Sequence, residues 1–140
     1  EVVSGKRVVL VDDSIIRGTT MQKRIEMARR AGAKEVHVRV ACPPTRHPCH
    51  FGIDFPEAGE LVATGRTEDQ VRRLCGADSL GYLSLEGLKS VLKGPQHYCY
   101  GCFDGRYPCS TEHAVNKHAL ELSGTENLED RHHRYGVMMQ

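Results

Sequence analysis

The order of apolar and polar positions predicts a chain that alternates strands with helices. Residues 8–11 are a continuous aliphatic run, typical of a parallel strand covered on both faces by helices. Residues 36–41 alternate apolar and polar positions with a period of two, and residues 79–83 form a further short run, so both are predicted as strands. A strand, a helix and a second strand in this order predict a right-handed βαβ unit in a parallel sheet.

Helical periodicity fills the intervals between these runs. Residues 19–31 place apolar side chains at i, i+4 and i+7 among basic ones, which predicts an amphipathic helix with a solvated face that carries Lys23, Arg24, Arg29 and Arg30. Thr67 and Gln70 match the capping-box pattern at the start of a second helix, and Ser84 is the predicted N-cap of a third. Residues 57–63 predict one more short helix. Strands that alternate with helices indicate an α/β domain.

Composition and charge narrow the class of protein without identifying it. The chain has 140 residues, 39% hydrophobic and 26% charged, which is ordinary for one globular domain. No apolar run approaches the length of a membrane span and no signal pattern opens the sequence, so we expect a cytoplasmic protein without a membrane partner. With 19 basic against 18 acidic residues, the net charge of +1 gives no case for nucleic-acid binding.

Candidate chemistry gathers where the first predicted strand ends. Asp12 and Asp13 close the strand, and ligands bind at the carboxyl ends of strands in open α/β sheets. Gly18 allows close backbone approach, Thr19 and Thr20 offer hydroxyl donors, and the start of the next helix favours an anion. The two carboxylates suit ribose hydroxyls or Mg²⁺. The segment therefore predicts a sugar-phosphate site.

Receiver domains of two-component signalling are an alternative source of paired acids at the end of a first strand. A receiver runs directly from these acids into a helix, whereas residues 14–18 intervene here. The phosphoacceptor Asp of a receiver follows an apolar strand, whereas the candidate Asp54 follows a proline-rich loop (residues 43–53). A receiver also has a Lys near the end of a later strand, which Lys93 resembles only superficially. A plain capping role for Asp12 and Asp13 is the remaining structural alternative.

Longer segments of the sequence resemble one enzyme family. The strand-end segment VVLVDDSIIRGTT (8–20) looks like the phosphoribosylpyrophosphate (PRPP) motif of phosphoribosyltransferases. The stretches ACPPTRHPCHFGID (41–54), GADSLGYLSLEGL (76–88) and HYCYGCFDGRYP (97–108) resemble the C-terminal part of the glutamine PRPP amidotransferases, in that order. The resemblance covers most of residues 5–108.

The resemblance implies a fold and a domain organisation. We expect a parallel-sheet, type I phosphoribosyltransferase-like α/β domain that is incomplete, because its N-terminal part is absent. Residues 1–109 would be the C-terminal part of that domain, and residues 110–140 a mobile or extraneous tail. In the family a glutaminase domain and a pyrophosphate-binding loop come earlier, so we expect this chain alone to be inactive. A non-catalytic PRPP- or nucleotide-binding role is the alternative.

The resemblance also implies an activity and its site. The family makes 5-phosphoribosylamine from PRPP and glutamine-derived ammonia, the first step of de novo purine biosynthesis. Asp12 and Asp13 would bind PRPP and Mg²⁺, and the other PRPP-binding residues would be Ser14, Ile15, Ile16, Arg17, Gly18, Thr19 and Thr20. No catalytic nucleophile is expected. Expected partners are the glutaminase domain of the same polypeptide, purine nucleotide inhibitors and further copies in a homo-oligomer.

Six cysteines are the second source of chemistry. Cys99 and Cys102 form a C-x-x-C, which alone is a modest signal shared by zinc sites, iron–sulfur clusters and redox pairs. The resemblance implies that Cys49, Cys99 and Cys102 are ligands of a [4Fe–4S] cluster whose fourth ligand lies outside this chain. Thiols packed in a core and a zinc site are the alternatives. Cys75 is predicted as a small buried residue on a helix face.

Overall fold

The computed structural model describes residues 2–53 and 58–109. The chain divides into two units, Glu1–Cys109 and Ser110–Gln140, and only the first contains described residues. The prediction of a mobile tail over 110–140 and the candidate receiver residue Asp54 therefore lie outside the described residues.

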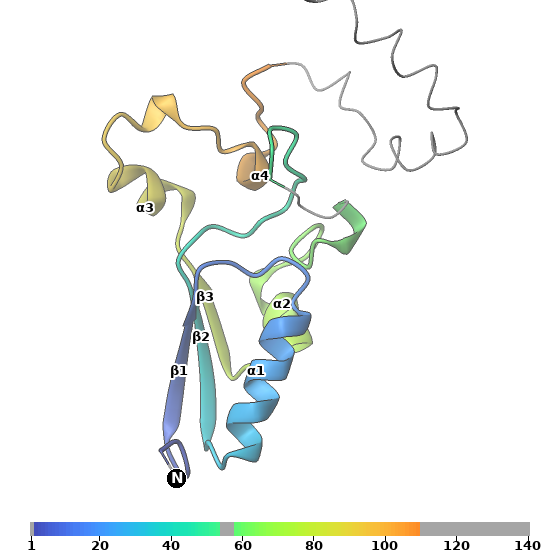
Figure 1. Cartoon of the computed structure of the whole chain (residues 1–140), viewed down its shortest axis with the longest axis vertical. Helices are drawn as coiled ribbons and strands as arrows, with labels where there is room; N and C mark the ends of the chain where they lie inside the picture. Colours follow the sequence, from blue (N-terminus) through green and yellow to red (C-terminus); the bar gives the residue numbers. More distant parts are fainter. Residues whose placement is uncertain (1, 54–57, 110–140) are drawn as a thin grey trace, which may run out of the picture. The chain divides into compact units, whose positions relative to one another are not determined.

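A parallel sheet forms the centre of the described unit, as the sequence predicts (Figure 1). Its strands are β1 (Arg7–Asp12), β2 (Glu35–Val40) and β3 (Ser79–Tyr82), and they lie in the order β1-β2-β3. Val8 pairs with Val36 and Asp12 with Val40, while Val40 also pairs with Tyr82. All three strands therefore end at one edge of the sheet, where Asp12 is placed.

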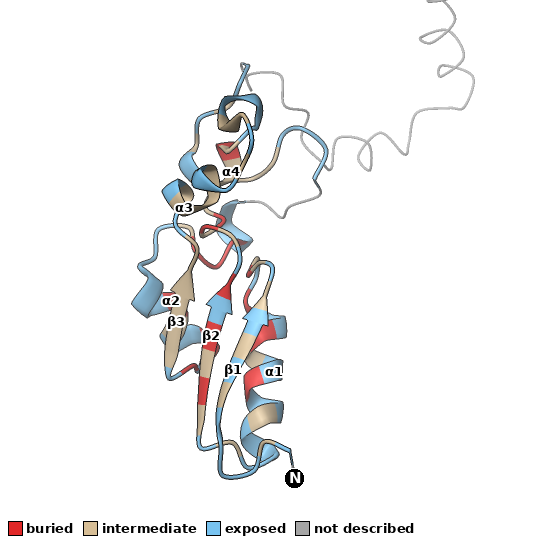
Figure 2. Ribbon diagram, turned by 90° about the vertical axis from the view of Figure 1, so that its left-hand side faces the viewer, coloured by how far each residue is buried: buried red, intermediate tan, exposed pale blue. Residues whose placement is uncertain are grey.

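Two helices cover one face of this sheet (Figure 2). They are α1 (Thr19–Arg30) and α2 (Glu68–Cys75), and the predicted capping box at the start of α2 is present with both of its hydrogen bonds. Their buried side chains pack on the β2 residues that face them, in a core that includes Ile25, Val36, Val38, Val71 and Cys75. Burying each of the larger aliphatic side chains contributes about 1.5 to 3 kcal/mol. Cys75 is a buried helix-face residue, as predicted.

The opposite face of β1 differs from the sequence prediction. The aliphatic run predicted a strand covered on both faces, yet Val9 is 57% exposed and Val11 73% exposed. Val8 and Leu10 point toward the helices and are half-buried. The expectation of a strand covered on both faces is therefore wrong for the described residues, because only the face of β1 toward the helices is covered.

Irregular segments and short helices lie beyond the carboxyl ends of the strands (Figure 1). After β3 come α3 (Leu85–Ser90), the 3₁₀ turn η2 (Pro95–His97) and α4 (Gly101–Asp104). The helix predicted over 57–63 is reduced to the 3₁₀ turn η1 (Ala58–Glu60), because Leu61 and the residues after it turn inward and are buried. Among the described residues no helix is both long and apolar enough to span a membrane.

Candidate functional site

An open pocket of about 340 Å³ lies at the end of β1. Every residue from Asp12 to Thr20 lines it, together with Met21 and Arg24. The structure therefore brings together all the residues that the sequence predicts as a PRPP-binding segment. It adds Arg24, which sequence patterning assigns to the solvated face of α1.

The loop between β1 and α1 is held by the protein behind it. Ile15 is buried, and the carbonyl of Ile16 accepts a hydrogen bond of 2.8 Å from the Val62 amide. Gly18 has a φ of +82°, and a Cβ there would lie 3.2 Å from Cγ2 of Val62. Only glycine combines this left-handed backbone with this close approach. The loop shape consequently depends on the segment around Val62 as much as on its own residues.

The start of α1 leaves its first amide groups available to a ligand. Gly18 is the N-cap residue and supplies no side-chain cap, and the first turn contains no acidic side chain. Thr19 and Thr20, at the first two helical positions, are exposed and line the pocket. Unpaired N–H groups, the positive end of the helix dipole and two hydroxyl groups together favour a phosphate here.

The two carboxylates have different surroundings. Asp12 forms an ion pair with Arg24, and its side chain is 23% exposed. Its Oδ1 also accepts the Asp13 amide at 3.3 Å. Asp13 is exposed and accepts a hydrogen bond of 3.0 Å from the hydroxyl of Ser14. Oxygen ligands of this kind suit Mg²⁺ or ribose hydroxyls, so the donor set fits both expected ligands.

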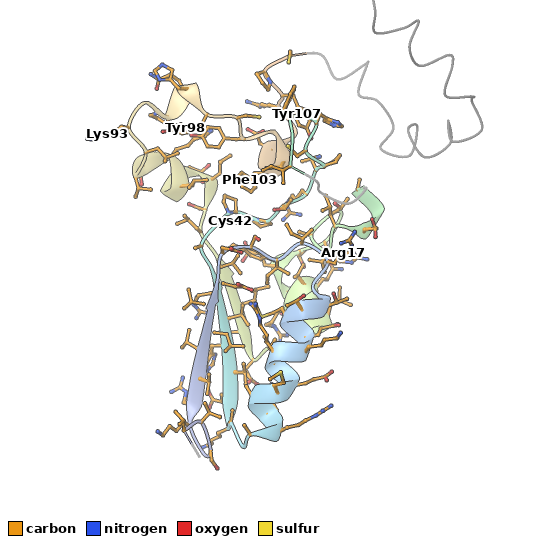
Figure 3. The ribbon with its side chains drawn as sticks, in the orientation of Figure 1. Arg17, Cys42, Lys93, Tyr98, Phe103 and Tyr107 are labelled. Carbon is orange, nitrogen blue, oxygen red and sulfur yellow. The ribbon has the colours of Figure 1, made fainter. Side chains whose placement is uncertain are left out.

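Arg17, labelled in Figure 3, is hydrogen-bonded to Glu60 of η1. Its Nε and Nη2 donate to the two carboxylate oxygens of Glu60 at 3.2 and 3.5 Å. The guanidinium thereby links the pocket loop to the segment after the proline-rich loop. Both side chains of this pair are 53% exposed, so the pair contributes little to stability.

The three predicted cluster cysteines come from two segments that are hydrogen-bonded to each other. The carbonyl of Cys102 accepts the amides of Arg46 at 2.9 Å and His47 at 3.1 Å, which joins α4 to the proline-rich loop. Burial raises the pKa of the Cys102 thiol, and the nearby Cys49 and Cys99 thiols add to this effect. Cys49 and Cys99 are thus both near enough to Cys102 to affect its thiol.

Two of these sulfur atoms accept backbone hydrogen bonds. The Gly101 amide donates to Sγ of Cys99 at 3.4 Å, and the Phe51 amide donates to Sγ of Cys49 at 3.5 Å. Amide donors to sulfur suit a thiolate bound to iron. Across 2–53 and 58–109, no group of three Cys, His, Asp or Glu side chains is arranged around a single metal ion. The thiols are therefore of the right ligand type for iron, but among the described residues they are not gathered into a metal site.

Cys42 lies just beyond the carboxyl ends of the strands (Figure 3). Burial raises the pKa of the Cys42 thiol to about 11, and Asp13 and Cys102 both contribute to the shift. The Cys42 thiol donates to the Pro43 carbonyl at 3.2 Å and is within electrostatic influence of both Asp13 and Cys102. The sequence pattern assigned no role to Cys42. Only its position in the structure, near Asp13 and Cys102, draws attention to it.

Comparisons with known proteins point to one family. Residues 1–50 match the phosphoribosyl transferase domain family. The chloroplastic amidophosphoribosyltransferase of Vigna aconitifolia is 46% identical over 125 residues, which are 89% of this chain and 26% of that protein. The amidophosphoribosyltransferase of Methanocaldococcus jannaschii is 51% identical over 107 residues, 76% of this chain and 22% of that protein.

A solved structure agrees with these relatives. The glutamine PRPP amidotransferase from B. subtilis, complexed with ADP and GMP, is 46% identical, with a TM-score of 0.70. The match covers 78% of this chain and 25% of that one. This chain thus spans about a quarter of the length of the relatives it matches. The receiver alternative is set aside, because sequence and fold agree on the other family.

Proposed function

Because this chain is a homologue within the amidophosphoribosyltransferase family that spans about a quarter of its relatives' length, we propose that its strand-end pocket binds PRPP. The observation that carries the proposal is the pocket itself, lined without a gap from Asp12 to Thr20. The parallel α/β fold and the family agree with the sequence prediction. The roles of the single residues below are proposals.

Different pocket residues bind different parts of the ligand. The exposed hydroxyls of Thr19 and Thr20 and the first amides of α1 bind the 5′-phosphate. Asp12 and Asp13 accept hydrogen bonds from the ribose hydroxyls. Gly18 lets the backbone approach the phosphate, because its left-handed conformation brings the loop against Val62.

The reaction proposed for the full-length protein is a displacement at the anomeric carbon of PRPP. Ammonia forms the new C–N bond while pyrophosphate leaves with the electrons of the C–O bond, and the resulting C1 ammonium group loses one proton to solvent to give 5-phosphoribosylamine. Mg²⁺, which Asp12 and Asp13 would help to hold, would neutralise negative charge on the leaving pyrophosphate. The protein contributes orientation and electrostatic stabilisation of a cationic ribosyl centre, to which the carboxylates of Asp12 and Asp13 are suited. No protein nucleophile is needed.

Cys49, Cys99 and Cys102 are proposed as three ligands of a [4Fe–4S] cluster. The proposal is supported by the hydrogen bonds between α4 and the proline-rich loop, which already hold the two thiol-bearing segments together. The cluster would be structural, because the displacement moves no electron. Anaerobic iron and sulfide analysis of this chain and of one extended upstream tests it. Four irons in the extended protein alone support it, and no iron in either refutes it.

The remaining partners follow from the family and are proposals too. The glutaminase domain, a homo-oligomer and purine nucleotide inhibitors are expected for the full-length protein. The B. subtilis relative is described in complex with ADP and GMP. Two relatives, from Vigna aconitifolia and Glycine max, are named as chloroplastic.

Binding of PRPP to the full chain in Mg²⁺ buffer, followed by titration calorimetry, tests the proposed function. The double variant Asp12→Asn with Asp13→Asn should lose binding while its circular dichroism spectrum is unchanged. Asp69→Asn is the matched control, because Asp69 is an exposed carboxylate on α2 outside the pocket. An unchanged affinity in the double variant would rule the assignment out.

A further inference from the structure

Arg24 reaches from the second turn of α1 to the end of β1. Its Nη1 forms an ion pair with Oδ2 of Asp12, and the side chain lines the pocket. The Arg24 side chain is 50% exposed, whereas that of Asp12 is 23% exposed. A half-exposed cation therefore lies directly on one of the two carboxylates that face the ligand.

The distribution of charge in the pocket makes this position significant. Two acidic side chains and two basic ones line it. Arg17 is paired with Glu60, which does not line the pocket. Arg24 is therefore the pocket cation that forms an ion pair with one of the two aspartates. A sugar phosphate that approached Asp12 and Asp13 without this cation would meet two like charges.

The guanidinium of Arg24 has N–H donors that the bond to Asp12 does not use. It carries five N–H donors in a fixed plane, and its hydrogen bond within the pocket goes from Nη1 to Asp12. Oδ1 of Asp12 does not bind Arg24; it accepts the Asp13 amide and has a second lone pair. One oxygen of Asp12 is thus fixed by Arg24 while the other remains able to accept a ribose hydroxyl.

We propose that Arg24 is a positioning residue that acts as a resident cation. It fixes the Asp12 carboxylate and lowers the concentration of divalent cation that sugar-phosphate binding requires. The inference rests on the proposed function of the pocket. Arg24 and a divalent cation compete for the same carboxylate. Removal of the guanidinium therefore weakens sugar-phosphate binding most where metal is absent and tightens the binding of metal alone.

The first arm of the test measures binding of ribose 5-phosphate to the full chain, in EDTA and at saturating Mg²⁺. Arg24→Met keeps the length of the side chain and removes its charge, and should weaken binding about fivefold in EDTA, as expected for a partly exposed ion pair. Saturating Mg²⁺ should reduce the loss to less than about twofold. Arg24→Lys should recover part of the affinity, and Arg30→Met, also on α1 and outside the pocket, should behave as wild type. Equal losses with and without Mg²⁺ would overturn the proposal.

The second arm uses Mn²⁺ alone and needs no sugar phosphate. Electron paramagnetic resonance should show Mn²⁺ bound about fivefold more tightly to Arg24→Met than to wild type, because Asp12 is released from its competitor. Unchanged Mn²⁺ affinity would overturn the inference. If the wild-type chain binds neither PRPP nor ribose 5-phosphate, the proposed function fails, and the Mn²⁺ result still decides whether Arg24 competes for Asp12.

Discussion

Replacement of Gly18 by alanine tests how the pocket loop is held. Gly18 has a φ of +82°, where an alanine costs about 1 to 2 kcal/mol. The new Cβ would also lie 3.2 Å from Cγ2 of Val62 and 3.6 Å from Sγ of Cys75, both buried. This crowding adds about 1 kcal/mol. We therefore expect Gly18→Ala to lower the free energy of unfolding by about 2 to 3 kcal/mol.

Urea unfolding followed by circular dichroism measures this loss, and Gly76→Ala separates its two causes. Gly76 has a similar φ of +78°, but nothing lies within 4 Å of the place that a Cβ would take, so it should lose only the backbone contribution of about 1 to 2 kcal/mol. Combining Gly18→Ala with Val62→Ala should cost less than the sum of the single changes, because the crowded methyl group is gone. Equal losses at Gly18 and Gly76, or strict additivity with Val62→Ala, would refute the reasoning.

Two further predictions concern groups outside the pocket. The Val36 amide donates to Oδ2 of Asp78 at 2.6 Å, and this bond, followed by Arg29, holds the pKa of Asp78 below its usual value. The stability that ionised Asp78 contributes to the fold is therefore complete above the unfolded pKa of about 3.9 and is lost as pH falls through the folded pKa. Asp78→Asn should cost about 1 kcal/mol at pH 7 and nothing in strong acid, and a constant cost in urea titrations across pH would contradict this. The buried hydroxyl of Tyr82 has no hydrogen-bond partner among the described residues. Tyr82→Phe should therefore leave the thermal midpoint of unfolding unchanged or raise it, with a gain in the free energy of unfolding of up to about 1 kcal/mol. A clear decrease in the midpoint would show that the hydroxyl has a partner.

Local signals in the sequence predicted the elements of the fold well. The aliphatic and alternating runs became β1, β2 and β3, and the helix predicted over 19–31 is observed as Thr19–Arg30. Ser84 caps α3 as predicted, because its hydroxyl accepts the Gly87 amide at 2.9 Å. Where the prediction failed, at 57–63, apolar residues that suggested a helix face are buried in a turn instead. Burial decided against helical propensity there.

The site was predictable only as far as it is contiguous in the chain. The strand-end pattern pointed to Asp12, Asp13 and residues 18–20, the family resemblance added residues 14–17, and all of them line one pocket because they follow one another in the chain. Arg24 was assigned to a solvated helix face, because helical spacing alone does not reveal that a long side chain reaches back to β1. The hydrogen bonds that hold Cys102 beside the proline-rich loop join residues far apart in sequence, and no local pattern reports them.

The strand order β1-β2-β3 has a consequence for how the chain is made. Each strand pairs with the next one in the sequence, so no early strand has to wait for a distant partner from the end of the unit. During synthesis, β1, α1 and β2 can form a first crossover, onto which α2 and β3 add as they leave the ribosome. The pocket loop belongs to that crossover, but its final shape waits for the segment around Val62, whose amide binds the Ile16 carbonyl, and Cys99 and Cys102 are made only after β3.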